Sequence, residues 1–391
     1  MKLSIKPYLT SFLILGILSV DTLAEEILIN GFLSAGMSRQ TNNTVSVASF
    51  STDYNVQEDT ILGIQLSKQL TDEFSVTGQL VGRGNEDYKV DASWIYASYQ
   101  PTDETFLRVG RIIMPLFYFS EFIEVGYGYN WIRPPEEVYR FPFSTMNAID
   151  VNHQFYLGDL EANAQFYVGN IINEVFQGVS LDARNTTGIV LNANYNYLNF
   201  RASYHQTEVD SPFDPDNAAV NPGLAAIWGG AQAIAGQLGL TQAQGLALAN
   251  EFLYDPEETN NFVQFSTAYN DEINLILFEW TAITGSDSTA AFLDDEGWLI
   301  HFSRKINNFT PHFTYAIVTN ETATGNLGAV QTLLTLERDI SSIIVGVRHD
   351  VAEGVALKYE VQQKNIDVML FPSGSTDDDA FLYGFAVDIV F

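Results

Sequence analysis

The sequence predicts an all-β fold, a closed antiparallel transmembrane β-barrel of about sixteen strands. Three observations support this class. Segments of about ten residues alternate between apolar and polar side chains, which is the period of a strand with one apolar face. After the N-terminal segment, no apolar run reaches the roughly 18 residues that a membrane helix needs. The connections between the segments alternate between short and long.

Residues 1–24 are predicted to be a cleaved signal peptide that directs export. Lys2 and Lys6 give a positively charged start, the apolar run "LTSFLILGILSV" follows, and "TLA" offers a small-residue cleavage site. The apolar run is too short to span a bilayer as a helix. The barrel domain is therefore expected to occupy residues 25–391.

Charge and cysteine content narrow the possible functions. The chain has 18 Lys and Arg against 48 Asp and Glu, a formal net charge of −30. This charge argues against a nucleic-acid partner, because phosphate binding needs a basic surface. The sequence has no cysteine. An exported chain without disulfides must be stabilised by a large sheet or core.

The last residues show the strand pattern most clearly. In "FLYGFAVDIVF", residues 381–391, every second side chain from Phe381 to Phe391 is apolar. "TGIVLNANYNY" and "LEANAQFYV" likewise place apolar side chains on one face and mainly Asn, Gln and small side chains on the other. A polar face suits a water-filled lumen, and aromatic residues at the ends of the apolar face suit membrane interfaces.

Short and long connections alternate, as they do on the two rims of an outer-membrane barrel, whereas a soluble β-sandwich has no reason to keep that order. The short turns are 70–73, 101–104, 157–160, 197–199, 270–272, 307–309 and 352–354. The long connections are 40–56, 84–89, 114–146, 170–185, 209–260, 284–295, 320–341 and 365–380. The predicted strands are 27–39, 57–69, 73–83, 90–100, 105–113, 147–157, 160–169, 186–197, 199–208, 261–270, 272–283, 296–306, 309–319, 342–350, 354–364 and 381–391. With an even number, the first strand can close on the last and remove both sheet edges.

Two long connections need separate interpretation. Segment 320–341 contains "GAVQTLLTLERDI", which is interpreted as a loop because a strand there would make the count odd. Segment 209–260 carries no charge from Ala218 to Asn250, and "TQAQ" before "GLALANEFL" is a capping-box pattern. We expect this extracellular loop to form short helices over the mouth of the barrel.

The most irregular connection is "MPLFYFSEFIEVGYGYNWIRPPEEVYRFPF", which holds ten aromatic residues, four glutamates and two arginines. It follows the fifth predicted strand on the long-loop side. Pro134 and Pro135 restrict its backbone. Phe141 and Phe143 are expected to anchor it to the barrel wall.

These features together resemble the general porin family of Gram-negative outer membranes. The resemblance lies in the signal "LSVDTLA", the sixteen alternating strands, the terminal "VDIVF" and the long loop after strand five. In that family the third long loop folds back into the barrel and narrows the pore. The resemblance therefore implies that 114–146 is a constriction loop here, although the family's Pro-Glu-Phe-Gly-Gly signature is absent. It also implies a homotrimer in the outer membrane, in contact with lipid and lipopolysaccharide.

The predicted constriction places Glu121 and Glu124 of this loop opposite Arg83 and Arg108 of the wall. Opposed acidic and basic groups set a transverse field that orders water and favours small polar solutes. The alternative is that both glutamates simply face solvent. Further charges are expected to face the lumen, because an Arg or Lys facing lipid at the midplane costs about 2–4 kcal/mol. They are Asp91, Asp150, Glu161, Arg201, Glu279, Arg348, Lys358, Glu360 and Asp388.

The expected function is passive diffusion of small hydrophilic solutes and ions, with a preference for cations because acids exceed bases. The alternatives are a substrate-selective channel and a surface receptor or adhesin built on the long loops. An enzyme is not expected, because the five histidines lie on separate strands without a Ser-His pattern. No cofactor or metal is expected. Ca²⁺ in the acidic clusters 294–296 and 377–379 is an alternative to simple solvation, but neither cluster matches a calcium-loop motif.

Overall fold

A computed structural model describes residues 27–41, 51–140, 145–176, 179–210, 229–230, 232–233, 236–253, 258–285, 294–322, 325–326, 328, 338–369 and 375–391. Within these ranges the chain forms one closed antiparallel barrel of sixteen strands, which confirms the predicted fold class. The predicted signal peptide lies outside the described residues, as do Phe141 and Phe143.

The strands follow one another around the barrel in chain order. They are β1 (Leu28–Gln40), β2 (Ile61–Gln69), β3 (Phe74–Arg83), β4 (Val90–Thr102), β5 (Thr105–Ile113), β6 (Thr145–Leu157), β7 (Leu160–Phe176), β8 (Val179–Tyr195), β9 (Leu198–Asp210), β10 (Glu258–Asn270), β11 (Asn274–Thr284), β12 (Asp294–Arg304), β13 (Phe309–Glu321), β14 (Arg338–Ala352), β15 (Val355–Met369) and β16 (Ser375–Val390). β1 closes the barrel on β16, with Phe32 opposite Val390 and Gln40 opposite Leu382.

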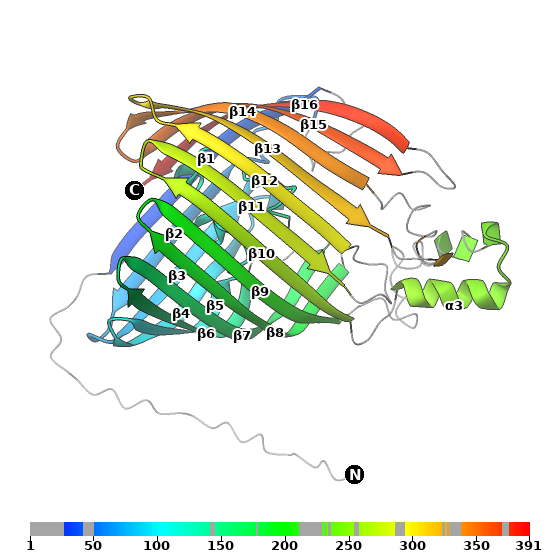
Figure 1. Ribbon diagram of the computed structural model, residues 1–391, viewed down its shortest axis with the longest axis horizontal. Coiled ribbons are helices and arrows are strands. Elements are labelled where there is room, and N and C mark those ends of the chain that lie inside the picture. Colours follow the sequence, from blue (N-terminus) through cyan, green and yellow to red (C-terminus); the bar gives the residue numbers. More distant parts are fainter. Residues whose placement is uncertain are drawn as a thin grey trace, which may run out of the picture.

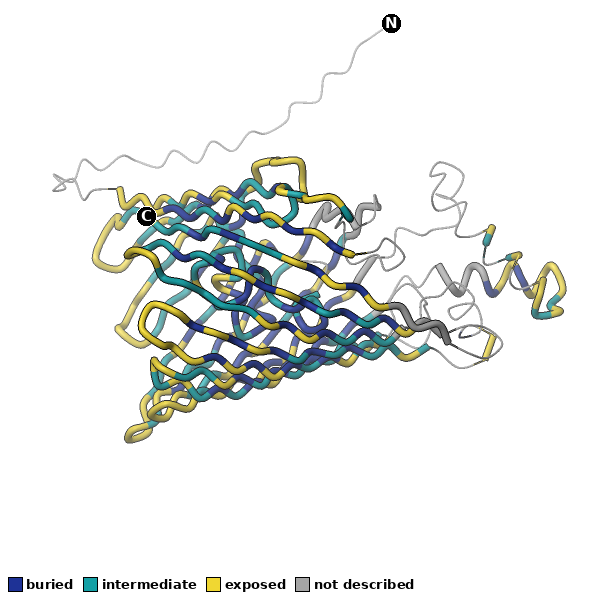
Figure 2. The backbone as a smooth tube through the Cα atoms, turned by 90° about the horizontal axis from the view of Figure 1, so that it is seen from above, coloured by how far each residue is buried: buried dark blue, intermediate teal, exposed yellow. Residues whose placement is uncertain are grey.

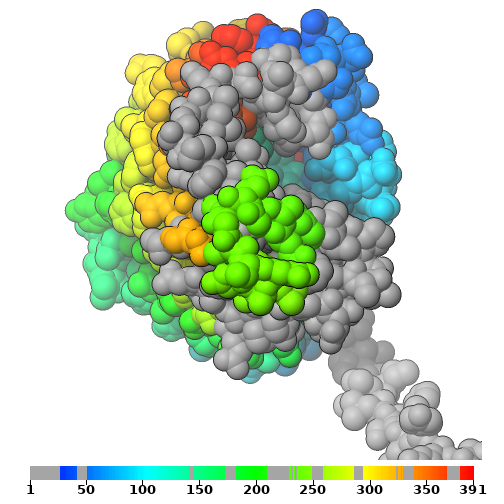
Figure 3. All heavy atoms as spheres, turned by 90° about the vertical axis from the view of Figure 1, so that its right-hand side faces the viewer, coloured from blue at the N-terminus to red at the C-terminus, as the bar shows by residue number. Residues whose placement is uncertain are grey.

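The two rims of the barrel differ. Short turns lie at the left end in Figure 1, and helix α3 (Gln242–Leu253), which belongs to the connection between β9 and β10, lies at the right end. Five of the short turns contain a residue with positive φ: Gly158 (64°), Asn196 (52°), Glu272 (68°), Asn307 (55°) and Gly354 (72°). Four of these five are Gly or Asn, which tolerate the left-handed region. Viewed from the long-loop side, the region of α3 lies over the mouth (Figure 3).

Burial alternates along the strands, as Figure 2 shows. On β12, Leu299 and His301 are 0% and 1% exposed, whereas Ile300 and Phe302 between and after them are 44% and 45% exposed. The exposed set forms the apolar outer face that a lipid bilayer requires, and the buried set points into the barrel. Among the described residues, no helix is both long and apolar enough to cross a membrane.

The strands are longer at the long-loop rim than the sequence predicted. β7 and β8 extend through most of the predicted loop 170–185, and β16 begins inside the predicted loop 365–380. The backbone ladder continues beyond the apolar band, where outward side chains no longer need to be apolar, so the alternation stops before the strand does. For the same reason the acidic clusters 294–296 and 377–379 lie in β12 and β16 and not in loops.

Candidate functional site

The segment from Met114 to Arg140, here called the inserted loop, packs inside the barrel against the inward faces of the strands. Two short 3₁₀ turns, Ser120–Phe122 and Gly126–Gly128, give it local structure. Its buried apolar side chains are Met114, Leu116, Phe117, Phe119, Tyr129, Trp131, Ile132 and Val138. Most of them join wall residues, including Leu277, Leu299, Ala316 and Ile344, in one hydrophobic cluster. The inserted loop is therefore part of the protein core and not a free flap.

A buried lysine of β15 holds the tip of the inserted loop. Lys358 Nζ donates to the carbonyl oxygen of Gly126 at 2.6 Å and to that of Trp131. It also forms an ion pair with Asp388 of β16 at 2.8 Å, and both side chains are only 1% exposed. A Cβ added to Gly126 would lie 2.5 Å from the Asp388 carboxylate, so only glycine allows this close approach.

An arginine of β14 holds the same tip from the next strand. Arg348 Nη1 donates to the carbonyl oxygens of Tyr127 at 2.6 Å and Tyr129 at 3.3 Å. The guanidinium also lies 4.4 Å from the centre of the Tyr127 ring and pairs with Asp350 at 2.8 Å. Together with Lys358, it donates hydrogen bonds to four carbonyl oxygens between residues 126 and 131.

On the adjoining strands β12 and β13, Trp131 and its neighbour Asn130 reach the wall. Trp131 Nε1 donates to Thr314 Oγ1 at 2.7 Å, and its ring contacts His301 with a centroid distance of 4.6 Å. Asn130 Nδ2 donates to Ser303 Oγ at 2.9 Å. The aromatic residues that looked unusual in the sequence thus have polar as well as apolar partners on the wall.

Glu279 of β11 anchors the start and the end of the inserted loop. Its carboxylate is completely buried and accepts hydrogen bonds from Tyr118 N at 2.8 Å, Tyr139 Oη at 2.5 Å and Gln264 Nε2 at 3.0 Å. Burial and the adjacent Glu279 charge raise the pKa of Tyr139 well above its usual range, so its hydroxyl remains a donor. Arg201, another predicted lumen charge, donates to the Pro115 carbonyl oxygen.

Of the four residues predicted at the constriction, the structure brings Arg83 and Glu124 together. The two form an ion pair, and Ser93 Oγ lies 2.9 Å from Arg83 Nη2 and 3.1 Å from Glu124 Oε2. Ser93 is completely buried at a bulge in β4, where the register with β3 shifts. The inserted loop therefore touches the β3–β4 wall at this point as well.

The other two residues predicted at the constriction, Glu121 and Arg108, do not form a direct ion pair among the described contacts. Arg108 Nε donates to Asp150 of β6 at 2.7 Å, and its guanidinium lies over the Tyr96 and Phe106 rings. Glu121 is exposed, and its charge acts on Arg108 and Arg201 through space. Arg108 and Asp150 are direct cross-strand partners, so the β5–β6 register itself brings them together.

The remaining predicted lumen charges have separate positions. Asp91 pairs with Arg111 at 3.1 Å and is about half exposed. Glu161 is exposed near the short β6–β7 turn. Glu360 is buried and accepts a hydrogen bond from Ile132 N at 3.2 Å. Sequence reasoning missed Arg133 of the inserted loop, which donates to both oxygens of Asp59, at 2.7 Å and 2.6 Å.

Inward residues differ in exposure around the barrel. From β9 to β16 most of them are buried, whereas inward residues of β2 to β5, such as Gln65, Thr77, Arg83 and Tyr96, remain partly exposed. Below the tip of the inserted loop, a pocket of about 700 Å³ is lined by Gln65, Gln79, Val125 and Tyr127, among others. Partly exposed inward residues therefore form a path along β2 to β5, where Glu124 pairs with Arg83, and the pocket also borders β1 and β16.

The charges beside this path are unbalanced. Arg83 also lies 3.6 Å from Glu86, and the charge of Asp91 acts on it. The group contains three arginines and five carboxylates, so its formal net charge is −2. The arginines are Arg83, Arg108 and Arg111, and the carboxylates are those of Glu86, Asp91, Glu121, Glu124 and Asp150.

No family model matches this chain, and no curated protein matches its sequence significantly. Solved structures do match over the whole barrel. OmpT (in-vitro folded, trimer form), an outer membrane protein of Vibrio cholerae, is 11% identical with a TM-score of 0.53, covering 94% of this chain and 99% of that chain. The outer membrane channel DcaP of Acinetobacter baumannii is 10% identical with a TM-score of 0.57, covering 94% and 97%. The anion-selective porin from Comamonas acidovorans is 10% identical with a TM-score of 0.56, covering 94% and 99%. The chain therefore has the sixteen-stranded barrel fold of the outer-membrane porins.

Proposed function

We propose that the protein is an outer-membrane channel through which small hydrophilic solutes and ions diffuse passively. The observation that carries this proposal is the divided lumen. One side of the barrel is filled by the inserted loop, and the other side keeps partly exposed polar residues from one rim toward the other. A narrowed aqueous path along a polar wall passes small polar solutes and excludes larger ones.

The charges at the narrowing support a preference for cations. The group around Arg83 leaves two formal negative charges beside the path, and this tally includes the charge of Glu121 on the exposed side of the inserted loop. Fixed negative charge in a narrow low-dielectric passage raises the local concentration of cations and lowers that of anions. One of the structural relatives is described as anion-selective, so this preference comes from the residues here and not from the fold.

Localisation and assembly follow from the same reasoning. The apolar outer face fits the outer membrane, with its lipid and lipopolysaccharide, and the N-terminal segment fits export by a cleaved signal peptide. A homotrimer is the assembly we propose, because the OmpT structure with the same fold is described as a trimer form.

A non-enzymatic role fits the described histidines inside the barrel. His205 is hydrogen-bonded to Tyr167, and His301 is hydrogen-bonded to Thr314. These imidazoles therefore have structural contacts within the wall and with the inserted loop. A substrate-selective channel is the second candidate, and the observation that favours it is a pocket on the long-loop side of the inserted loop, described below.

Reconstitution into planar bilayers tests the proposed function. We expect stepwise conductance increments that grow in proportion to salt concentration. Liposomes that contain the protein should swell at rates that fall as the size of a neutral solute rises. Insertion without conductance, with the barrel shown to be folded by circular dichroism, would contradict the proposal.

A further inference from the structure

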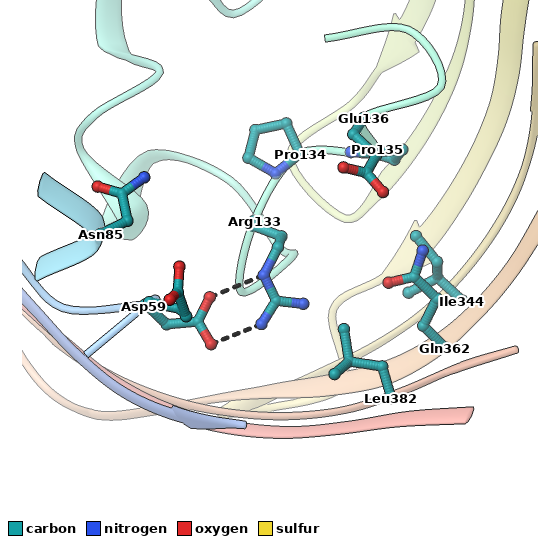
Figure 4. A pocket seen from close by; sticks show the side chains of 10 residues that line it. Asp59, Asn85, Arg133, Pro134, Pro135, Glu136, Ile344, Gln362 and Leu382 are labelled. Carbon is teal, nitrogen blue, oxygen red and sulfur yellow. Dashed lines mark hydrogen bonds and ion pairs between the residues drawn. The ribbon is translucent and has the colours of Figure 1, made fainter. Parts of the chain in front are cut away.

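A second pocket lies between the inserted loop and the barrel wall, on the long-loop side. It has a volume of about 230 Å³ and is here called the outer pocket. Its lining residues are Glu58, Asp59, Asn85, Arg133, Pro134, Pro135, Glu136, Ile344, Gln362 and Leu382. Figure 4 shows the inserted loop on one side, with Ile344, Gln362 and Leu382 facing it from the wall.

The charged groups of the outer pocket are not equivalent. Arg133 and Asp59 neutralise each other in the two-point ion pair drawn in Figure 4. Glu136 contacts Lys364 of β15 at the edge of the pocket. Within the described part of the chain, no hydrogen bond or ion pair engages the Glu58 carboxylate. The pocket therefore presents one uncompensated negative charge.

The pKa of Glu58 agrees with an uncompensated negative charge in the outer pocket. Partial burial, followed by the charge of Asp59, raises the pKa of Glu58, and Arg133 only partly opposes the shift. The charge of a bound cation would oppose this rise in pKa, because an opposite charge nearby favours the ionised carboxylate.

The rest of the lining is complementary to an organic ion and not to a bare metal ion. Pro134, Pro135, Ile344 and Leu382 give apolar surface on two sides. Gln362 Nε2 donates to Ser342 Oγ at 2.9 Å, so its carbonyl oxygen remains as an acceptor. Small-molecule sites combine apolar walls with a few placed polar groups in this way.

We propose that the outer pocket binds a small organic ammonium ion, with the ammonium group against Glu58 and an apolar or aromatic body between the prolines and Leu382. This inference rests on the proposed channel function and names the solute class that the channel collects at its outer mouth. A cationic solute held there lies on the side from which solutes enter. The next acidic groups that it meets are those beside Arg83 and Glu124.

Calorimetric titration of the folded protein in detergent with benzylamine tests the site. Benzyl alcohol and benzoate serve as neutral and anionic probes of similar shape. We expect Glu58→Gln to weaken benzylamine binding about tenfold, because a charge-assisted contact is lost. Glu272→Gln, in the exposed turn on the other rim, is the matched control and should leave the affinity for benzylamine unchanged. Asn85→Asp adds a carboxylate to the lining and should strengthen binding, a gain that misfolding cannot produce.

Equal affinities of the original protein and Glu58→Gln would overturn the proposal, as would benzyl alcohol or benzoate binding as tightly as benzylamine. Single-channel recording separates this failure from failure of the channel itself. A protein that conducts but does not bind benzylamine refutes the outer pocket and leaves the channel. A protein that binds benzylamine but never conducts refutes the channel. Blocking events caused by benzylamine from the long-loop side, and reduced by Glu58→Gln, would support both.

Discussion

Replacing Lys358 by methionine should release the tip of the inserted loop. Lys358 is 1% exposed and is surrounded by Asp388 at 2.8 Å and the carbonyl oxygens of Gly126 and Trp131. Methionine fills a similar volume but donates no hydrogen bond. The substitution therefore leaves one buried carboxylate without its counterion and removes the lysine donor from two carbonyl oxygens.

The expected cost is about 3–5 kcal/mol, the range for removing one partner of a buried ion pair. The β15–β16 backbone ladder does not depend on the lysine side chain, since Lys358 pairs with Ala386 through the main chain. The energy is therefore lost mainly from docking of the inserted loop and not from closure of the barrel. We expect the tip to become mobile and the path beside it to widen and fluctuate.

Single-channel recording measures this directly. Lys358→Met should raise mean conductance and increase current noise, whereas Lys305→Met in an exposed turn should change neither. The double variant Lys358→Met with Asp388→Asn removes the orphaned charge and should recover most of the lost stability, because a missing buried pair costs less than a broken one. Unchanged conductance and noise in a folded Lys358→Met protein would refute the view that this lysine holds the loop.

Three further predictions concern the same structure. Gly126→Val should also increase current noise and cost about 1–3 kcal/mol, because its side chain would meet the Asp388 carboxylate. Trp131→Ala should lower the free energy of unfolding by about 3–5 kcal/mol in a denaturant titration, since it opens a cavity in the loop–wall cluster. Asp271 accepts backbone and side-chain hydrogen bonds from Asn274, which lower its pKa to about 2. Its stabilising contribution should be complete above about pH 4 and lost as pH falls through about 2, so the stability difference between Asp271→Ala and the original protein should be much smaller at pH 2 than at pH 6.

The sixteen strands were predictable because each has to present an apolar face to lipid while its other face is polar or covered. That requirement produces a two-residue period of apolar side chains in segments such as 381–391. The structure confirms all sixteen predicted strands. The rim extensions of β7 and β8 were missed because the backbone ladder there is not accompanied by an apolar face.

Few contacts of the site could be predicted from the sequence. The pair of Arg108 and Asp150 carried a signal that was not used: consecutive strands β5 and β6 place them opposite each other. We predicted that Glu124 faces Arg83 only from the position of the inserted loop after the fifth strand. No local signal pointed to the roles of Glu279 and Lys358, because their partners in the inserted loop lie more than 100 residues away in sequence. Such contacts depend on the path of the loop through the lumen, which periodicity does not specify.

The reversal potential in a potassium chloride gradient shows directly whether the channel prefers cations to anions. If the path along β2 to β5 is lined by uncompensated acids, the potential has the sign of a cation-preferring channel. Glu121→Gln should then move it toward zero, because the exposed carboxylate beside Arg108 is lost. Glu104→Gln, in the exposed β4–β5 turn, should leave it nearly unchanged. A potential of anion-preferring sign, or one that Glu121→Gln does not move, would contradict this account.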